Sequence, residues 1–133
     1  MTWLGTVDEI GSAGSHVLLD YVNYKKGENG DGEWVLSVLR DCVRECGVRE
    51  VHSHVETFDG EYSPPGFAAV VLIDESHVTA HCYSERGILA IDVFTCGDSD
   101  PSEVAAMIND VLVSEIPGLR RVFEKRVERF RSD

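Results

Sequence analysis

The sequence is short of positive charge. It carries 12 lysine and arginine residues against 24 aspartate and glutamate residues, a formal net charge of −12. A surface of that sign repels nucleic acid and anionic lipid, so we expect neither as a partner. It attracts cationic small molecules over long range. The acidic surface is equally consistent with a role in solubility alone, so the sequence does not decide between solubility and attraction of a cationic ligand.

Long hydrophobic runs are missing as well. The longest clean apolar run, residues 67–73, is far too short to cross a bilayer. The first ten residues, MTWLGTVDEI, lack both the basic region and the apolar core of a signal peptide. We therefore expect a cytoplasmic protein. Its four cysteines are predicted to be free thiols in that compartment: Cys42, Cys46, Cys82 and Cys96.

Several common site motifs are also absent. There is no glycine-rich phosphate loop and no G-x-S-x-G nucleophile elbow. Cys42 and Cys46, four residues apart on one helix, resemble half of a zinc site, with His52 and His54 on one strand face as the other half. Both cysteines, however, lie on the apolar stripe of the helix, where cysteine acts as a small buried hydrophobe. We expect no metal centre.

The length and composition of the sequence predict a single domain, residues 1–133. Patterns typical of strands and helices follow one another along it. Residues 16–21 are typical of a strand, and residues 23–33 of a polar, glycine-rich connector. Apolar residues at helical spacing predict a helix from Trp34 to Cys46, ended by Gly47. A strand over residues 48–58 follows, and the prolines and glycines of residues 59–66 predict irregular structure.

The second half contains three short apolar runs separated by turn residues. Residues 67–73, 77–83 and 88–94 predict consecutive strands of an antiparallel meander. Asp100-Pro101 is a typical helix start, and Pro117-Gly118 ends that helix. The expected buried side chains of this helix are Val104, Ile108, Val111 and Leu112. Residues 120–130 predict an edge strand.

This order of elements indicates an α+β fold, a two-layer sandwich of a mainly antiparallel sheet with two helices on one face. The other sheet face would be left without helices. A second copy of the chain is the simplest cover, so we expect a homodimer, with association beyond a dimer left open.

Reactive side chains gather at the strand ends of the meander. They are Ser76, His81, Glu85 and Cys96. Adjacent strands lie about 5 Å apart, so we expect such residues to converge into one site. Taken singly, Ser76 also fits a turn, and His81 also fits a satisfied core histidine.

The segment VVLIDESHVTAHCYSERGILAIDVFTCGDSDP, residues 70–101, resembles the central part of the short prokaryotic S-adenosylmethionine decarboxylases. The resemblance rests on Glu75-Ser76-His77, Thr79-Ala80-His81, Ser84-Glu85 and Phe94-Thr95-Cys96-Gly97. The upstream run Tyr62-Ser63-Pro64-Pro65-Gly66 is similar to an aromatic, proline and glycine segment of that family. Weaker similarity extends over most of the chain.

The resemblance implies a proenzyme that cleaves itself between Glu75 and Ser76. Ser76 then becomes a pyruvoyl group, which replaces pyridoxal phosphate by forming a Schiff base with the substrate amine. His81 would be the base of the processing reaction, and Cys96 would return a proton to the substrate carbon. The implied pathway is polyamine (spermidine) biosynthesis.

The same resemblance implies that Tyr62 stacks on adenine and that Glu85 binds the ribose hydroxyls. Two departures matter. Ala68 stands where the family usually has a serine that assists processing, and HCYSE replaces a common HTWPE around Glu85. Some relatives decarboxylate L-arginine or L-ornithine, so these substrates remain the alternative to S-adenosylmethionine. A non-catalytic regulatory homologue is a further alternative.

Overall fold

The computed structural model describes residues 13–25, 31–96 and 99–130. Part of the predicted connector (26–30) and Gly97 lie outside the described residues. The elements are β1 (Gly14–Val22), α2 (Asp31–Glu45), β2 (Glu50–Phe58), β3 (Gly66–Ile73), β4 (Ser76–Tyr83), β5 (Ile88–Cys96), α3 (Pro101–Glu115) and β6 (Arg120–Arg129).

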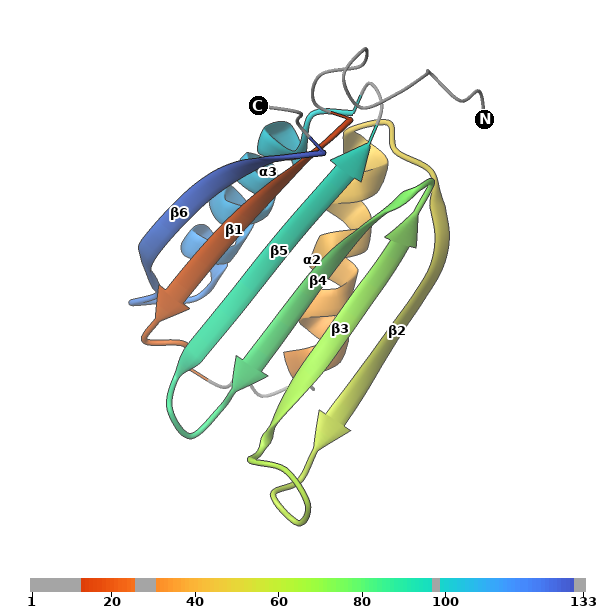
Figure 1. Cartoon of the computed structure of the whole chain (residues 1–133). Helices are drawn as coiled ribbons and strands as arrows, with labels where there is room; N and C mark the ends of the chain where they lie inside the picture. The colour runs from red at the N-terminus through yellow and green to blue at the C-terminus, as the bar shows by residue number, and fades with distance from the viewer. Residues whose placement is uncertain (1–12, 26–30, 97–98, 131–133) are drawn as a thin grey trace.

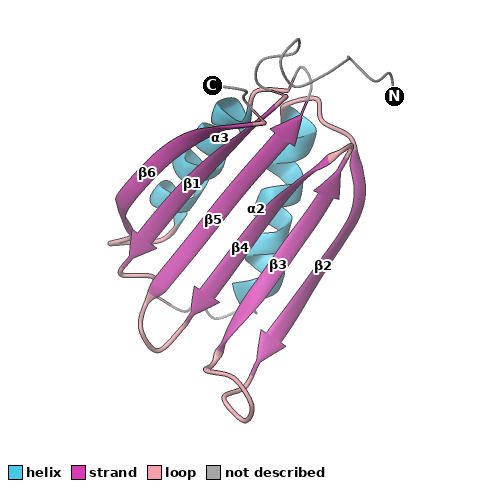
Figure 2. Ribbon diagram, viewed as in Figure 1, coloured by secondary structure: helices cyan, strands magenta, loops and turns pink. Residues whose placement is uncertain are grey.

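The six strands form one sheet in the order β2-β3-β4-β5-β1-β6, and every neighbouring pair is antiparallel. Figure 1 shows both helices behind this sheet, and Figure 2 shows the opposite face carrying strands alone. The predicted α+β sandwich is therefore confirmed. The meander prediction is also confirmed, because β3, β4 and β5 are neighbours in chain order, and β6 forms an edge as expected.

Alternation along the strands separates a buried face from an open one. On β4, Val78, Ala80 and Cys82 are buried toward the helices. The intervening residues, such as Thr79 and His81, point to the face without helices, which we call the outer face. The apolar sides of α2 and α3 complete the core. The predicted burial of Val104, Ile108 and Leu112 on α3 is confirmed, whereas Val111, also predicted to be buried, is only partly so.

The start of α2 was predicted three residues too late. The helix begins at Asp31, not at Trp34. The acidic side chains of Asp31 and Glu33 lie in its first turn, where they favour the positive end of the helix dipole. Gly32 is there because the helix lies against the sheet: a Cβ on it would stand 2.9 Å from Val55 and 3.1 Å from Phe67. Gly32, whose residue type is typical of a loop, thus allows the start of α2 to pack closely against the sheet.

The start of α3 agrees with prediction. Asp100 is the N-cap, and its side chain accepts a 2.9 Å hydrogen bond from the Ser102 backbone N–H, with Pro101 in the first turn. No helix in the described part of the chain is long and apolar enough to cross a membrane.

Candidate active site

Ser76 opens β4 directly after a two-residue turn, Asp74-Glu75, that joins it to β3. Ile73 and Ser76 face each other across this turn. Glu75 has a backbone φ of 63°, in the left-handed region. A residue with a side chain is strained there by about 1–2 kcal/mol. The strain therefore lies in the residue that precedes Ser76.

The turn is anchored by Arg49, which precedes β2. The Arg49 guanidinium donates two hydrogen bonds to the Asp74 carboxylate, at 2.7 and 2.9 Å. The Asp74 backbone N–H also donates to the Arg49 carbonyl, at 3.2 Å. The guanidinium lowers the pKa of Asp74. One residue thus fixes both the main chain and the side chain of Asp74.

Ser76 and Cys96 are brought together by this geometry. The backbone N–H of Cys96, the last residue of β5, donates a 2.9 Å hydrogen bond to Ser76 Oγ. Burial is the main factor that raises the pKa of the Cys96 thiol, and the Glu75 carboxylate raises it further. Hydrogen bonding to Ser76 and the charge of Arg129 act in the opposite direction but do not prevail. At neutral pH the thiol is therefore protonated, as an acid must be.

Next to Cys96 lies a row of rings on the outer face. Phe94 faces His16 on β1 and His77 on β4, with ring centroids 5.9 and 5.5 Å away. His16 Nε2 is buried, has no hydrogen-bond partner among the described residues, and stands 3.7 Å from Asp92 Oδ1. Burial, and then the neighbouring His16, lower the pKa of His77. Sequence reasoning missed this row, although the alternation of Asp92, Phe94 and Cys96 places them on one strand face.

Arg129 approaches the same corner from β6. Its guanidinium lies 5.4 Å from the centroid of the Phe94 ring. Between β5 and β6 lies β1, and its first residue, Gly14, pairs with both Cys96 and Arg129. A Cβ on Gly14 would stand 3.3 Å from Cys96 Sγ and 3.2 Å from the Phe94 ring. The missing side chain leaves room for the thiol and the ring.

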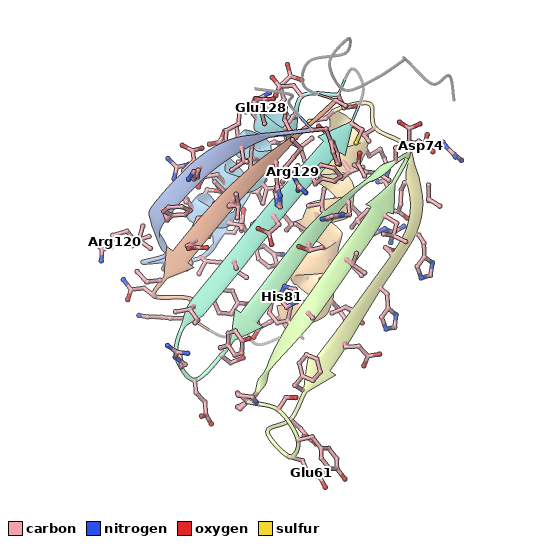
Figure 3. The ribbon with its side chains drawn as sticks, in the orientation of Figure 1. Glu61, Asp74, His81, Arg120, Glu128 and Arg129 are labelled. Carbon is pink, nitrogen blue, oxygen red and sulfur yellow. The ribbon has the colours of Figure 1, made fainter. Side chains whose placement is uncertain are left out.

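His81 lies elsewhere. It is five residues along β4 from Ser76, which at about 3.3 Å per residue is roughly 16 Å. Its neighbours across the strands are Ala68 and Ala90. Figure 3 shows His81 far down the sheet from Asp74. The expected convergence of all four reactive residues therefore does not occur within one chain. Ala68, the departure from the family serine, is the residue directly opposite His81.

Glu85 and Tyr62 belong to the same end of the sheet as His81. Glu85 is in the turn between β4 and β5, and Tyr62, with 94% of its surface exposed, is in the loop between β2 and β3. The Ser84 backbone N–H donates to the Pro65 carbonyl at 3.0 Å, which ties the two connections together. Close by, a hollow of about 310 Å³ is lined by residues that include Asp20, His81 and Val122.

The residues considered for zinc do not converge. Cys42 is buried on α2, behind the sheet, whereas His52 and His54 are exposed on the outer side of β2. In the described ranges there is no group of three or more potential metal-ligating side chains. All four cysteines are free thiols, as predicted.

The fold is shared with a known class of decarboxylase. A crystal structure described as the adenosylmethionine decarboxylase from Aquifex aeolicus VF5 superposes with a TM-score of 0.65 over 90% of this chain and 92% of that one. The sequence identity is 24%, so this likeness shows the fold alone.

The sequence comparisons define the family. The family model for S-adenosylmethionine decarboxylase matches residues 15–122. S-adenosylmethionine decarboxylase proenzymes from Geobacillus sp. and Bacillus velezensis are 32% and 35% identical, over 86% and 74% of this chain and 95% and 75% of theirs. One from Clostridium tetani is 38% identical over 64% of each chain. The chain belongs to the S-adenosylmethionine decarboxylase family.

Proposed function

We propose that the chain is a self-processing, pyruvoyl-dependent S-adenosylmethionine decarboxylase of polyamine biosynthesis, acting in the cytoplasm as one domain, residues 1–133. The observation that carries the proposal is the strained Glu75 directly before a serine whose Oγ is held by the Cys96 N–H. A serine that only begins a strand does not require a protonated thiol beside it.

That geometry supports self-cleavage in the following steps. Ser76 Oγ attacks the carbonyl carbon of Glu75, the C–N bond breaks, and an ester replaces the amide. Removal of the Ser76 α-proton then expels the Glu75 carboxylate. The dehydroalanine that remains is hydrolysed, with loss of ammonia, to a pyruvoyl group at position 76. Cleavage relieves the left-handed strain at Glu75, which favours the reaction in the forward direction.

A pyruvoyl group at position 76 supplies the carbonyl that condenses with the substrate amine and accepts the electrons released with CO₂. The chain's own residues do the rest. The Cys96 thiol, protonated at neutral pH and next to position 76, donates a proton to the substrate carbon. The acidic surface attracts the sulfonium substrate.

The roles proposed for His81, Tyr62 and Glu85 require a second copy of the chain. All three lie at the end of the sheet away from Ser76, and the outer face between the two ends is uncovered. Packing two outer faces about a twofold axis, with strands reversed, brings the partner's His81, Tyr62 and Glu85 to Ser76. Large apolar side chains on this face, Leu72, Tyr83 and Phe123, are at present exposed. We therefore include the homodimer in the proposal.

Two measurements test the function. Denaturing electrophoresis and intact mass are expected to show fragments 1–75 and 76–133, the second with a blocked terminus. CO₂ release is then compared with S-adenosylmethionine, L-arginine and L-ornithine. S-adenosylmethionine is favoured because the similar proteins are S-adenosylmethionine decarboxylase proenzymes. Preference for an amino acid would overturn the substrate, and an intact, inactive chain would favour the regulatory homologue.

The dimer has its own test. Phe123→Asp on the outer face is expected to shift the sedimentation coefficient toward the monomer, because a buried charge would replace an apolar contact. Val113→Asp on α3 is the matched control, since Val113 is 45% exposed and Phe123 is 44% exposed. Equal behaviour of the two variants would contradict the proposed interface.

A further inference from the structure

The turn that precedes Ser76 is not held by packing. Asp74 and Glu75 are both exposed, so no side chain in the described part of the chain buries them. What fixes Asp74 is the set of three hydrogen bonds with Arg49, two from its guanidinium and one to its carbonyl. A two-residue turn with such an anchor resists relaxation of its left-handed residue, because moving Asp74 breaks the pair.

The anchors of the two reacting atoms are separate. Ser76 Oγ, the nucleophile, is held from β5 by the Cys96 N–H. The carbonyl carbon that it attacks belongs to Glu75, next to the residue that Arg49 holds from the start of β2. An attack of this kind needs the two atoms about 3–3.5 Å apart and aligned, so both anchors must be in place at once.

We propose that Arg49, acting through Asp74, is a positioning residue for self-cleavage at Glu75–Ser76. This inference rests on the proposed function. It concerns the cleavage step alone, because Arg49 touches neither Ser76 nor Cys96 in the hydrogen bonds described above. The planar fork of the guanidinium meets both carboxylate oxygens, and a lysine cannot reproduce that two-point contact.

A purely surface role for the pair makes the opposite prediction. Exposed ion pairs contribute little to stability, and many have no measurable effect. If Arg49 and Asp74 were such a pair, breaking them would leave the cleavage rate unchanged. The test is therefore the rate of cleavage and not the stability of the protein.

The rate is measured by pulse–chase in cell-free translation, following conversion of the full chain into its two fragments. Arg49→Gln is expected to slow conversion about fivefold, the rate equivalent of a good exposed bidentate pair. Arg49→Lys should fall between it and the wild type. The exchanged pair, Arg49→Asp with Asp74→Arg, should recover part of the rate. The matched control is Arg44→Gln, an exposed arginine paired with Asp41 on α2, which should cleave at the wild-type rate.

Two further readings separate positioning from folding. In a Ser76→Ala background, Arg49→Gln should leave the melting temperature near that of Ser76→Ala alone. Once cleaved, Arg49→Gln should decarboxylate as fast per cleaved site as the wild type. A much lower melting temperature would assign the slowing to folding and overturn the inference, as would an exchanged pair no faster than Arg49→Gln.

The outcomes distinguish the inference from the function beneath it. If the wild type cleaves and Arg49→Gln cleaves equally fast, the positioning role is wrong and the proposed function stands. If the wild type does not cleave at all, the proposed function itself fails.

Discussion

The two ends of β4 differ in how many reactive groups one chain brings together there. At the Ser76 end, one chain supplies the strained Glu75, the held hydroxyl of Ser76 and the protonated thiol of Cys96. At the other end, His81 faces two alanines across the strands, beside an open hollow. The fold brings Ser76 and Cys96 together at one end of β4. At the other end, His81 lies far from both within the same chain. On the proposed function, a complete site would need both ends, from two copies.

The largest effect is expected at the Ser76 end of β4. Ser76→Ala should abolish cleavage completely, because no hydroxyl remains to attack the Glu75 carbonyl, and the protein should run as a single chain of 133 residues. Electrophoresis and intact mass measure this directly. Ser114→Ala, an exposed serine on α3, is the control that should cleave normally. Cleavage of Ser76→Ala at the same site would contradict the assigned nucleophile.

The next effect separates the two reactions at that end. Cys96→Ser should lower decarboxylation by about 10²–10⁴-fold, the usual contribution of a positioned acid. It should still permit cleavage, because the substitution keeps the Cys96 backbone N–H that donates to Ser76 Oγ. CO₂ release per cleaved site is the measurement, with Cys46→Ser, directly after α2, as control. Equal loss of cleavage and decarboxylation would contradict the prediction that the Cys96 thiol serves decarboxylation and not cleavage.

Mixing two inactive chains tests whether the ends cooperate across copies. Chains carrying Ser76→Ala and chains carrying His81→Ala are each expected to be inactive in homodimers. Coexpressed, random pairing makes half of the dimers mixed, each with one intact site, so about a quarter of wild-type activity should return. Activity of purified, tag-separated mixed dimers gives the answer. No recovery would mean that Ser76 and His81 must come from one chain.

The smallest expected effect is a shift in pH dependence. The Cys96 thiol is an acid while the pH stays below its pKa, and burial has raised that pKa. Arg129 lowers it, so removing the charge with Arg129→Gln should raise the pKa further and move the alkaline limb of kcat to higher pH. Arg120→Gln, at the other end of β6, should leave the limb in place. A downward shift for Arg129→Gln would contradict the electrostatic role.

Local patterns predicted most of this fold. Short apolar runs separated by turn residues located the meander, and Asp100-Pro101 located the start of α3, because these signals act within a few residues. The start of α2 was missed because Gly32 serves packing against Phe67, a contact with a distant residue.

The site was predictable in its residue types but not in its layout. Adjacent strands brought Ser76 and Cys96 together as expected. The separation of Ser76 from His81 follows from the rise along a single strand, which the expectation of convergence did not take into account. The Arg49–Asp74 pair joins residues 25 positions apart, and no local pattern signals it.

The position of β1 has a consequence for a chain cut after Glu75. The fragment 1–75 would hold β1, α2, β2 and β3, and the fragment 76–133 would hold β4, β5, α3 and β6. In the sheet, β1 lies between β5 and β6, so the first fragment is inserted between two strands of the second. The pieces are interlocked, and separating them would break both ladders of β1 together with the β3–β4 ladder. A chain cut after Glu75 would therefore be expected to stay together as one folded domain.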